Sequence, residues 1–149
     1  MMNKAIYFDM DGTIADLYGV ENWLDFIIER NPLPYEIAKP LVNLSHLARK
    51  LNTLRRNGWK VGVVSWLSKE DNPEYNEVVT KAKKVWLEKH LPSVVWDEIQ
   101  IVSYGTPKST AVSEIGILFD DEAPNRNEWE KAGGNAYNVH NILEVLGGL

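Results

Sequence analysis

The strongest constraint on the fold is a short apolar run near the N-terminus that ends abruptly in acidic residues. Residues 4–13 read K-A-I-Y-F-D-M-D-G-T, and the apolar residues 5–8 suit a buried β-strand. Asp9 and Asp11 follow this strand directly. Two carboxylates this close in a partly dry site repel each other, and one of them is forced to take up a proton. A bound divalent cation removes the repulsion, and Mg²⁺ prefers carboxylate oxygens.

The turn after these carboxylates allows two interpretations. Gly12 permits a tight turn or a positive φ angle, and Thr13 offers a hydroxyl and a backbone N–H to an anion. The same D-x-D-G pattern is also ordinary turn chemistry after an edge strand. The choice between a binding site and a plain turn depends on the remainder of the chain.

Composition excludes several classes of protein. The 149 residues suit one domain over 1–149, and a hydrophobic content of 44% with 25% charged residues is typical of a soluble globular protein. The chain has no cysteine, which excludes disulfides, thiolate metal sites and a cysteine nucleophile. No apolar stretch reaches the roughly 18 residues of a membrane span, and the N-terminus lacks the long apolar segment expected of a signal peptide. We therefore expect a cytoplasmic protein without a membrane partner.

The charge balance limits the choice of partners. The net charge is −5 and the pI about 5.2. Proteins that bind nucleic acid gain most of their affinity from a basic excess, so this balance argues against such a partner. A small anionic substrate is still possible, because a cation and a few local donors suffice to hold it. His46, His90 and His140 lie far apart in the sequence and receive no metal role.

Strands and helices alternate along the rest of the chain. Residues 17–43 are expected to form a small helical excursion, after which apolar runs predict strands at 59–65, 98–102, 116–119 and 135–139. Helices are predicted between them, with a Leu-rich face from Leu44 to Leu54 and further helices at 74–90, 108–114, 124–132 and 142–146. This alternation favours a parallel sheet with helices on both faces.

Three of the predicted strands end in polar groups. These are Asp9 with Asp11, Ser65, and Asp120 with Asp121. In parallel sheets, ligands bind beyond the carboxyl ends of the strands, so we expect these groups to meet at one edge.

Several nearby polar residues have two possible roles. Lys108 is either a surface residue or a cation of this edge, and Lys83 or Lys84 is its rival for that role. The lysines of the 74–90 helix are otherwise expected on its solvated face, namely Lys81, Lys83, Lys84 and Lys89. Asn125 and Arg126 either steady the Asp120 loop or lie on the surface, and Glu122 suits a solvated helix start.

The ordered set of motifs resembles the haloacid dehalogenase superfamily of phosphohydrolases. The matching residues are D-M-D-G-T after the first strand, V-V-S after the second, Lys108, and F-D-D after the fourth. The resemblance implies a Rossmann-like α/β three-layer sandwich with a central, mostly parallel five-stranded sheet in the order 3-2-1-4-5. It also implies that residues 17–43 form a minimal helical cap inserted after strand 1.

The resemblance also implies roles for these residues. Asp9 would attack phosphorus and form an aspartyl-phosphate, and Asp11 would protonate the leaving oxygen and then activate water. Mg²⁺ would be held by Asp9, the Asp11 backbone carbonyl and Asp120, with Asp121 as a ligand or a second-layer residue. Residues that would bind the phosphoryl group are Ser65, Lys108 and the backbone N–H groups around Met10, Asp11 and Trp66.

A narrower resemblance concerns the substrate. Residues 84–109, followed by I-L-F-D-D, are similar to the 5'(3')-deoxyribonucleotidases, which implies a nucleoside monophosphate as the substrate. Two features depart from that family: the cap is shorter, and Trp66-Leu67 replace a small polar residue after Ser65. Four aromatic residues of the cap either stack on a base or bury the cap against the main domain, namely Tyr18, Trp23, Phe26 and Tyr35.

Two other functions remain open at this level. A small cap leaves room for a phosphatase that acts on a bulky substrate, such as a 3'-phosphorylated nucleic-acid end or a phosphoprotein. Alternatively, the fold serves as a non-catalytic binding module, although such a module would be expected to lose Asp9, Asp11 or the F-D-D carboxylates.

Overall fold

A computed structural model describes residues 3–149 and contains one five-stranded and one two-stranded sheet. Among these residues, none of the helices combines the length and the apolar character required to cross a membrane. In chain order the elements are β1 (Ala5–Phe8), β2 (Ala15–Asp16), η1 (Leu17–Gly19), α1 (Trp23–Ile28), α2 (Leu33–Ile37), β3 (Lys39–Pro40), α3 (Leu44–Arg56), β4 (Lys60–Trp66), α4 (Pro73–His90), β5 (Glu98–Val102), α5 (Lys108–Ala111), β6 (Ile117–Phe119), α6 (Ala123–Lys131), β7 (Asn135–Tyr137), η2 (Val139–Asn141) and α7 (Ile142–Gly147).

The main sheet has the order β5-β4-β1-β6-β7, and all of its strand pairs are parallel. Counted along the chain, these are its third, second, first, fourth and fifth strands, so the predicted order 3-2-1-4-5 is confirmed. The central strand β1 pairs with β4 through Ile6 and Val61 and with β6 through Ile6 and Ile117. Because all five strands run in the same direction, their carboxyl ends lie at one edge of the sheet.

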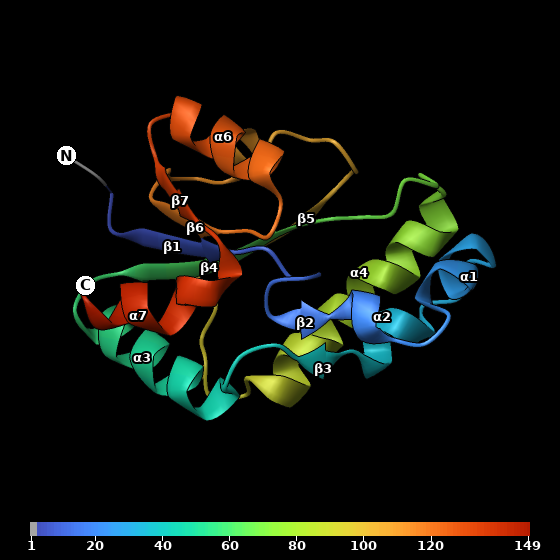
Figure 1. The fold of residues 1–149 in the computed structure, drawn as a ribbon, viewed down its shortest axis with the longest axis horizontal. Helices are drawn as coiled ribbons and strands as arrows, with labels where there is room; N and C mark the ends of the chain where they lie inside the picture. The colour runs from blue at the N-terminus through green and yellow to red at the C-terminus, as the bar shows by residue number, and fades with distance from the viewer. Residues whose placement is uncertain (1–2) are drawn as a thin grey trace.

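Alternate side chains of β1 point to opposite faces of the sheet, and each face packs against a layer of helices (Figure 1). Ile6 and Phe8 pack into a large cluster that includes side chains of α3, α4 and α7. Ala5 and Tyr7 face the opposite side, where Trp129 of α6 covers them. The period of two along a strand sends neighbouring side chains to opposite faces, and this produces the predicted three-layer α/β sandwich.

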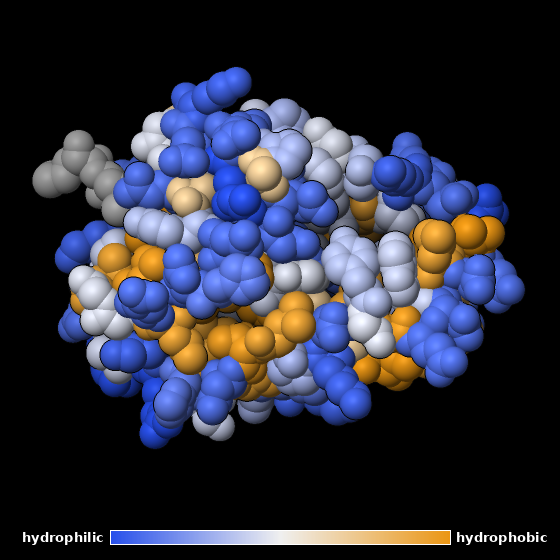
Figure 2. Space-filling model, in the orientation of Figure 1, coloured by the Kyte–Doolittle hydropathy of each residue, from blue (hydrophilic) through white to orange (hydrophobic). Residues whose placement is uncertain are grey.

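Residues 17–43 lie beyond the carboxyl edge of the sheet and pack against α4 (Figure 1). Leu17 and Tyr35 contribute to a small apolar cluster with Tyr75, Val79 and other side chains. In contrast, α1 has no buried residue although five of its six residues are apolar. Figure 2 shows apolar surface over this helix.

Two local predictions differ from the structure. Residues 39–40, expected within a helical excursion, form the antiparallel pair β2–β3, in which Asp16 is opposite Lys39. The helix predicted at 108–114 ends at Ala111. It stops there because Val112 is extended and the backbone N–H and hydroxyl of Ser113 both donate to the Glu98 carboxylate, which draws the chain towards β5.

A core substitution tests the packing of α3 against the sheet. Leu51 is fully buried in the larger cluster, so Leu51→Ala should lower the free energy of unfolding by about 3 kcal/mol through lost burial and a residual cavity. Urea denaturation followed by circular dichroism measures this loss. The exposed neighbour Lys50 is the control, because Lys50→Ala should change stability by less than about 0.5 kcal/mol. Equal effects of the two substitutions would contradict the assigned packing.

Candidate active site

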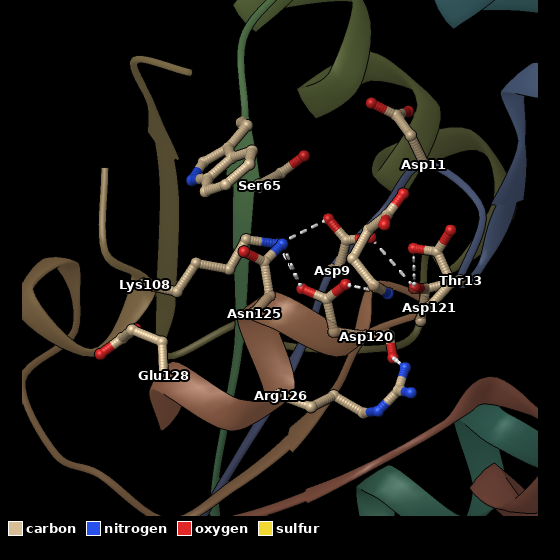
Figure 3. Close-up of polar contacts among 12 residues, drawn as sticks. Asp9, Asp11, Thr13, Ser65, Lys108, Asp120, Asp121, Asn125, Arg126 and Glu128 are labelled. Carbon is tan, nitrogen blue, oxygen red and sulfur yellow. Dashed lines mark hydrogen bonds and ion pairs between the residues drawn. The ribbon is translucent and has the colours of Figure 1, made fainter. Parts of the chain in front are cut away.

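Asp9 lies at the carboxyl end of the central strand and is 7% exposed. Its backbone N–H donates to the carbonyl of Phe119 at 3.0 Å, which ties it to the end of β6. The carboxylate is held from two sides, because Lys108 Nζ donates to Oδ1 at 2.9 Å and Thr13 Oγ1 to Oδ2 at 3.0 Å (Figure 3). Asp9 is therefore a fixed carboxylate at the edge where the strands end.

Gly12 makes the turn after Asp9 possible. Its φ angle is +81°, and a Cβ atom at this position would collide with the carboxylate of Asp121. The turn is closed by the Met10 carbonyl, which accepts backbone hydrogen bonds from residues 13, 14 and 15. The D-x-D-G segment is thus a tight turn, and it lets the residues after β1 contact those after β6.

Asp120 follows β6 and is completely buried. Its Oδ2 accepts hydrogen bonds from Lys108 Nζ at 2.6 Å and from Asn125 Nδ2 at 3.3 Å, while Oδ1 accepts from the Glu122 backbone N–H at 2.9 Å. Arg126 donates to the Asp120 carbonyl at 2.9 Å. Asn125 and Arg126 therefore steady the Asp120 loop, the first of the two roles considered from the sequence.

Three carboxylates cluster at this edge. Each of Asp9, Asp120 and Asp121 offers an oxygen within 4.8 Å of the others. Burial, followed by the negative charge of Asp9, raises the pKa of Asp120 to about 6 and the pKa of Asp121 to about 7. Burial and the repulsion between neighbouring carboxylates thus both disfavour the charged forms of these two groups.

Lys108 is 2% exposed and connects two of these carboxylates. Burial alone would lower its pKa, but the charges of Asp9 and Asp120 outweigh burial and raise the pKa to about 12. The ammonium group is therefore charged at neutral pH. The structure brings Lys108 to the predicted edge rather than to the surface.

Lys83 was expected on the solvated face of its helix, and that expectation is wrong. The side chain is 1% exposed, and its Nζ donates to Asp11 Oδ2 at 2.9 Å and to Ser65 Oγ at 2.7 Å. Lys84, the other rival considered for the role of Lys108, is exposed. The signal was present in the sequence, because Lys83 lies four residues after Val79 and four before Leu87 on the buried stripe of α4.

Asp11 lies apart from the three clustered carboxylates, and Figure 3 shows its side chain on the far side of Asp9 from Asp120. Burial raises the pKa of the Asp11 carboxyl above its ordinary value, although the nearby charge of Lys83 acts in the opposite direction. A carboxyl in this environment is more readily protonated than an exposed one. Asp9 and Asp11 thus have different partners although they belong to the same loop: Lys108 and Thr13 contact Asp9, whereas Lys83 contacts Asp11.

Ser65 and Trp66 end β4 beside this loop. Ser65 is completely buried, and the Trp66 carbonyl accepts a hydrogen bond from Lys83 Nζ at 2.7 Å. The indole Nε1 of Trp66 donates to the Thr106 carbonyl at 2.7 Å, which fixes the ring against the loop before α5. The sequence-predicted residues of the second strand therefore reach the same edge as Asp11.

A pocket of about 600 Å³ opens above these groups. Asp9, Asp11 and Lys108 line it, together with side chains of residues 17–35. Two aromatic pairs border the pocket: the ring centroids of Tyr18 and Trp23 are 5.0 Å apart, and those of Trp66 and Tyr104 are 4.9 Å apart. Tyr35 also lines it, whereas Phe26 is not among its lining residues.

The donor set of this edge fits a divalent cation. Four carboxylates, those of Asp9, Asp11, Asp120 and Asp121, share the edge with two buried ammonium groups, so the net charge of the six groups is −2 when all of them are ionised. All of the candidate ligand atoms are oxygens, the type that Mg²⁺ prefers. The charge and the chemistry of these residues are thus compatible with a divalent cation.

No protein-family model matches the chain, and no curated protein sequence matches it. Solved structures do match. A D,D-heptose 1,7-bisphosphate phosphatase from Burkholderia thailandensis has a TM-score of 0.56 and 14% identity, with 89% of this chain and 75% of that chain covered. The same type of phosphatase from B. bronchiseptica, complexed with magnesium and phosphate, has a TM-score of 0.56 and 14% identity over 98% and 88% of the two chains.

A third solved structure is the Pnkp1/Rnl/Hen1 complex, with a TM-score of 0.59 and 18% identity. The alignment covers 93% of this chain but 45% of that chain, so the present chain spans less than half of the matched one. These similarities establish a common fold. The chain has the Rossmann-like α/β fold of these phosphatases, with its acidic cluster at the carboxyl edge of the sheet.

The raised pKa values predict how stability depends on pH without metal. Asp120 and Asp121 bind protons more tightly in the folded than in the unfolded chain, so they stabilise the fold at low pH, and this contribution is lost as pH rises through about 6 to 7. In EDTA, the melting temperature should therefore fall between about pH 5 and pH 8. Added Mg²⁺ should raise it more at pH 8 than at pH 5.

Asp121→Asn is the control for this experiment, because it removes one of the two titrating carboxyls. The pKa of His90 is lowered, first by burial, and this residue acts on stability in the opposite direction. Differential scanning fluorimetry of both proteins isolates the carboxyl contribution as the difference between their curves. Identical pH profiles for the two proteins, or an equal magnesium effect at both pH values, would contradict the prediction.

Proposed function

We propose that this chain is a magnesium-dependent phosphomonoester hydrolase that acts through an aspartyl-phosphate on Asp9. The observation that carries the proposal is the placement of the Asp9 carboxylate, which faces the pocket and is fixed by Lys108 and Thr13. A nucleophile that is already oriented needs little rearrangement to attack. The phosphatase names of two fold neighbours support the same class of reaction.

In the first step, an Asp9 oxygen attacks phosphorus and the bond to the leaving oxygen breaks. Asp11 gives its proton to that oxygen, and the raised pKa of its carboxyl favours the protonated form that this role requires. In the second step, Asp11 takes a proton from water, and the resulting hydroxide attacks phosphorus. The bond between phosphorus and the Asp9 oxygen breaks, inorganic phosphate leaves, and both carboxyl groups return to their initial states.

Ser65, Lys108 and backbone N–H groups near Trp66 are proposed to bind the phosphoryl oxygens. Lys108 already bridges Asp9 and Asp120, so its charge lies beside the attacking carboxylate. Mg²⁺ at this edge would offset the repulsion between the carboxylate and the phosphate dianion. Donors fixed before the reaction stabilise the developing charge without further reorganisation.

The metal is proposed to be held by Asp9, the Asp11 carbonyl and the Asp120–Asp121 pair. From the sequence, Asp120 was ranked first as the direct ligand. Its two carboxylate oxygens already accept hydrogen bonds from Lys108, Asn125 and a backbone N–H. The Asp121 carboxylate accepts from Thr13 at 3.5 Å, near the outer limit for a hydrogen bond. These contacts favour Asp121 as the direct ligand and Asp120 as the anchor of Lys108.

Replacement of the nucleophile tests the reaction. Asp9→Asn should lower the rate of phosphate release from p-nitrophenyl phosphate by on the order of 10³-fold or more, because the covalent step is lost. Asp25→Asn makes the same chemical change at an exposed position of α1 and should leave the rate unchanged. Steady-state assays with Mg²⁺ measure both variants. An Asp9→Asn protein as active as the parent chain would exclude Asp9 as the nucleophile.

For the substrate, we propose a nucleoside monophosphate. The two aromatic pairs at the pocket offer flat faces on which a base can stack, and stacking is worth about 1–3 kcal/mol per base. Both buried lysines near the pocket are paired with carboxylates, which leaves them poorly suited to a second phosphate. A single phosphate attached to a planar group matches this lining best.

A panel of substrates tests this choice. The kcat/KM values for deoxynucleoside monophosphates should exceed those for sugar phosphates and 3'-phosphorylated oligonucleotides. Trp23→Ala should lower kcat/KM for the nucleotide by about tenfold while p-nitrophenyl phosphate is affected less, because a stacking contact is lost. A strong preference for the oligonucleotide would favour the bulky-substrate alternative. Absence of magnesium-dependent turnover on every phosphate ester would favour a non-catalytic binding module.

A further inference from the structure

Lys83 is a buried lysine with all three of its N–H donors in use. They bind Asp11 Oδ2 at 2.9 Å, Ser65 Oγ at 2.7 Å and the Trp66 carbonyl at 2.7 Å. An ammonium group has three donors and no acceptor capacity, so these contacts saturate it. Lys83 therefore has no free donor for a phosphoryl group, in contrast to a lysine that binds substrate directly.

Burial of the Lys83 ammonium group lowers the stability of the fold. A buried charge loses its hydration, and the ion pair with Asp11 restores only part of that free energy. The neighbouring positions on the same stripe of α4, Val79 and Leu87, are apolar and complete the core without any charge. Lys83 thus adds a charge to a stripe whose neighbouring positions bury apolar side chains.

The two buried lysines reach the site from different elements and hold different carboxylates. Lys108, from α5, binds Asp9 and Asp120. Lys83, from α4, binds Asp11 and the end of β4. Each lysine thus fixes one of the two carboxylates that are proposed to react, and neither lysine binds both.

The contact with Lys83 leaves the hydroxyl group of Ser65 available as a donor. Because Ser65 Oγ accepts a hydrogen bond from Lys83 Nζ, one of its lone pairs is occupied and its own O–H is left to act as a donor. A phosphoryl oxygen needs a donor, not an acceptor. Lys83 therefore fixes the position of Ser65 Oγ and leaves its O–H available to an anion, while the same ammonium group holds one oxygen of Asp11.

We propose that Lys83 is a positioning residue that couples the acid–base carboxylate Asp11 to the phosphoryl-binding hydroxyl of Ser65. The proposal rests on the phosphohydrolase function inferred above. Lys83 acts through these two groups, because it has no N–H donor left for the substrate. Its loss should therefore lower the overall rate. It should also change the dependence of the rate on the leaving group and the affinity for inorganic phosphate.

The first test compares two substrates in Lys83→Met, with Lys84→Met as the matched control at an exposed position. p-Nitrophenolate leaves readily without a proton, whereas an alkoxide requires one. The ratio of kcat/KM for p-nitrophenyl phosphate to kcat/KM for an alkyl phosphate should therefore rise by about tenfold or more in Lys83→Met, since general acids contribute 10²–10⁴-fold. Lys84→Met should leave the ratio unchanged.

The second test follows the coupling to Ser65 through inhibition by inorganic phosphate. Lys83→Met and Ser65→Ala should each raise the inhibition constant for phosphate. The inhibition constant of the double variant should not exceed the larger of the two single-variant values, because both substitutions remove the same donor. Multiplied effects in the double variant would overturn the coupling.

Thermal denaturation separates these effects from misfolding. If Lys83→Met does not fold, Lys83→Gln retains two donors without the charge, and it should show the same changes to a smaller extent. Equal losses for both substrates with an unchanged inhibition constant in a folded variant would show that Lys83 is only structural. An inactive parent chain would instead reject the proposed function itself, which is a distinguishable outcome.

Discussion

The balance of charge at the carboxyl edge of the sheet is the constraint on which the rest of the structure depends. Four aspartates and two lysines meet there, and both ammonium groups are almost completely removed from water. Lys83 comes from α4 and Lys108 from α5, so the two cations approach from the opposite helical layers of the sandwich. Each layer must therefore be correctly packed before the acids of the central loop acquire their partners. Stability of the fold and assembly of the site are thus linked through the three ion pairs of these two lysines.

The sheet makes this concentration of charge tolerable. Strand β1 is apolar throughout, and the charged residues begin only where it ends. Gly12 then turns the chain sharply enough for Asp121 to approach, a position that a side chain would block. The aromatic pairs above the acids limit contact with water while leaving the pocket open. A low local dielectric strengthens each charged contact, so the same enclosure that makes the edge costly also makes it chemically effective.

Most of the sheet could be predicted from the sequence, because its signals are local. Apolar runs located the five strands, and the polar residues after them located the shared edge; the strand order came from the family resemblance.

The predictions that failed depend on distant contacts. Ser113 leaves its helix because of Glu98, and the β2–β3 pair joins residues that are remote in the sequence. Lys83 was misplaced because a lysine among apolar residues was assigned to the solvated face, although its spacing placed it on the buried stripe. Asp120 and Asp121 are adjacent in the chain, so their different partners became visible only in three dimensions.

The central place of β1 has a consequence for the way the chain is made. This strand is synthesised before both of its partners, because Ile6 pairs with Val61 on one side and with Ile117 on the other. During synthesis its second edge stays open until β6 emerges, and an apolar strand with an open edge is prone to pair with other chains. The segment that closes this edge also carries Asp120 and Asp121. Protection from aggregation and the completion of the acidic cluster therefore arrive together, when residues 117–121 are added to the chain.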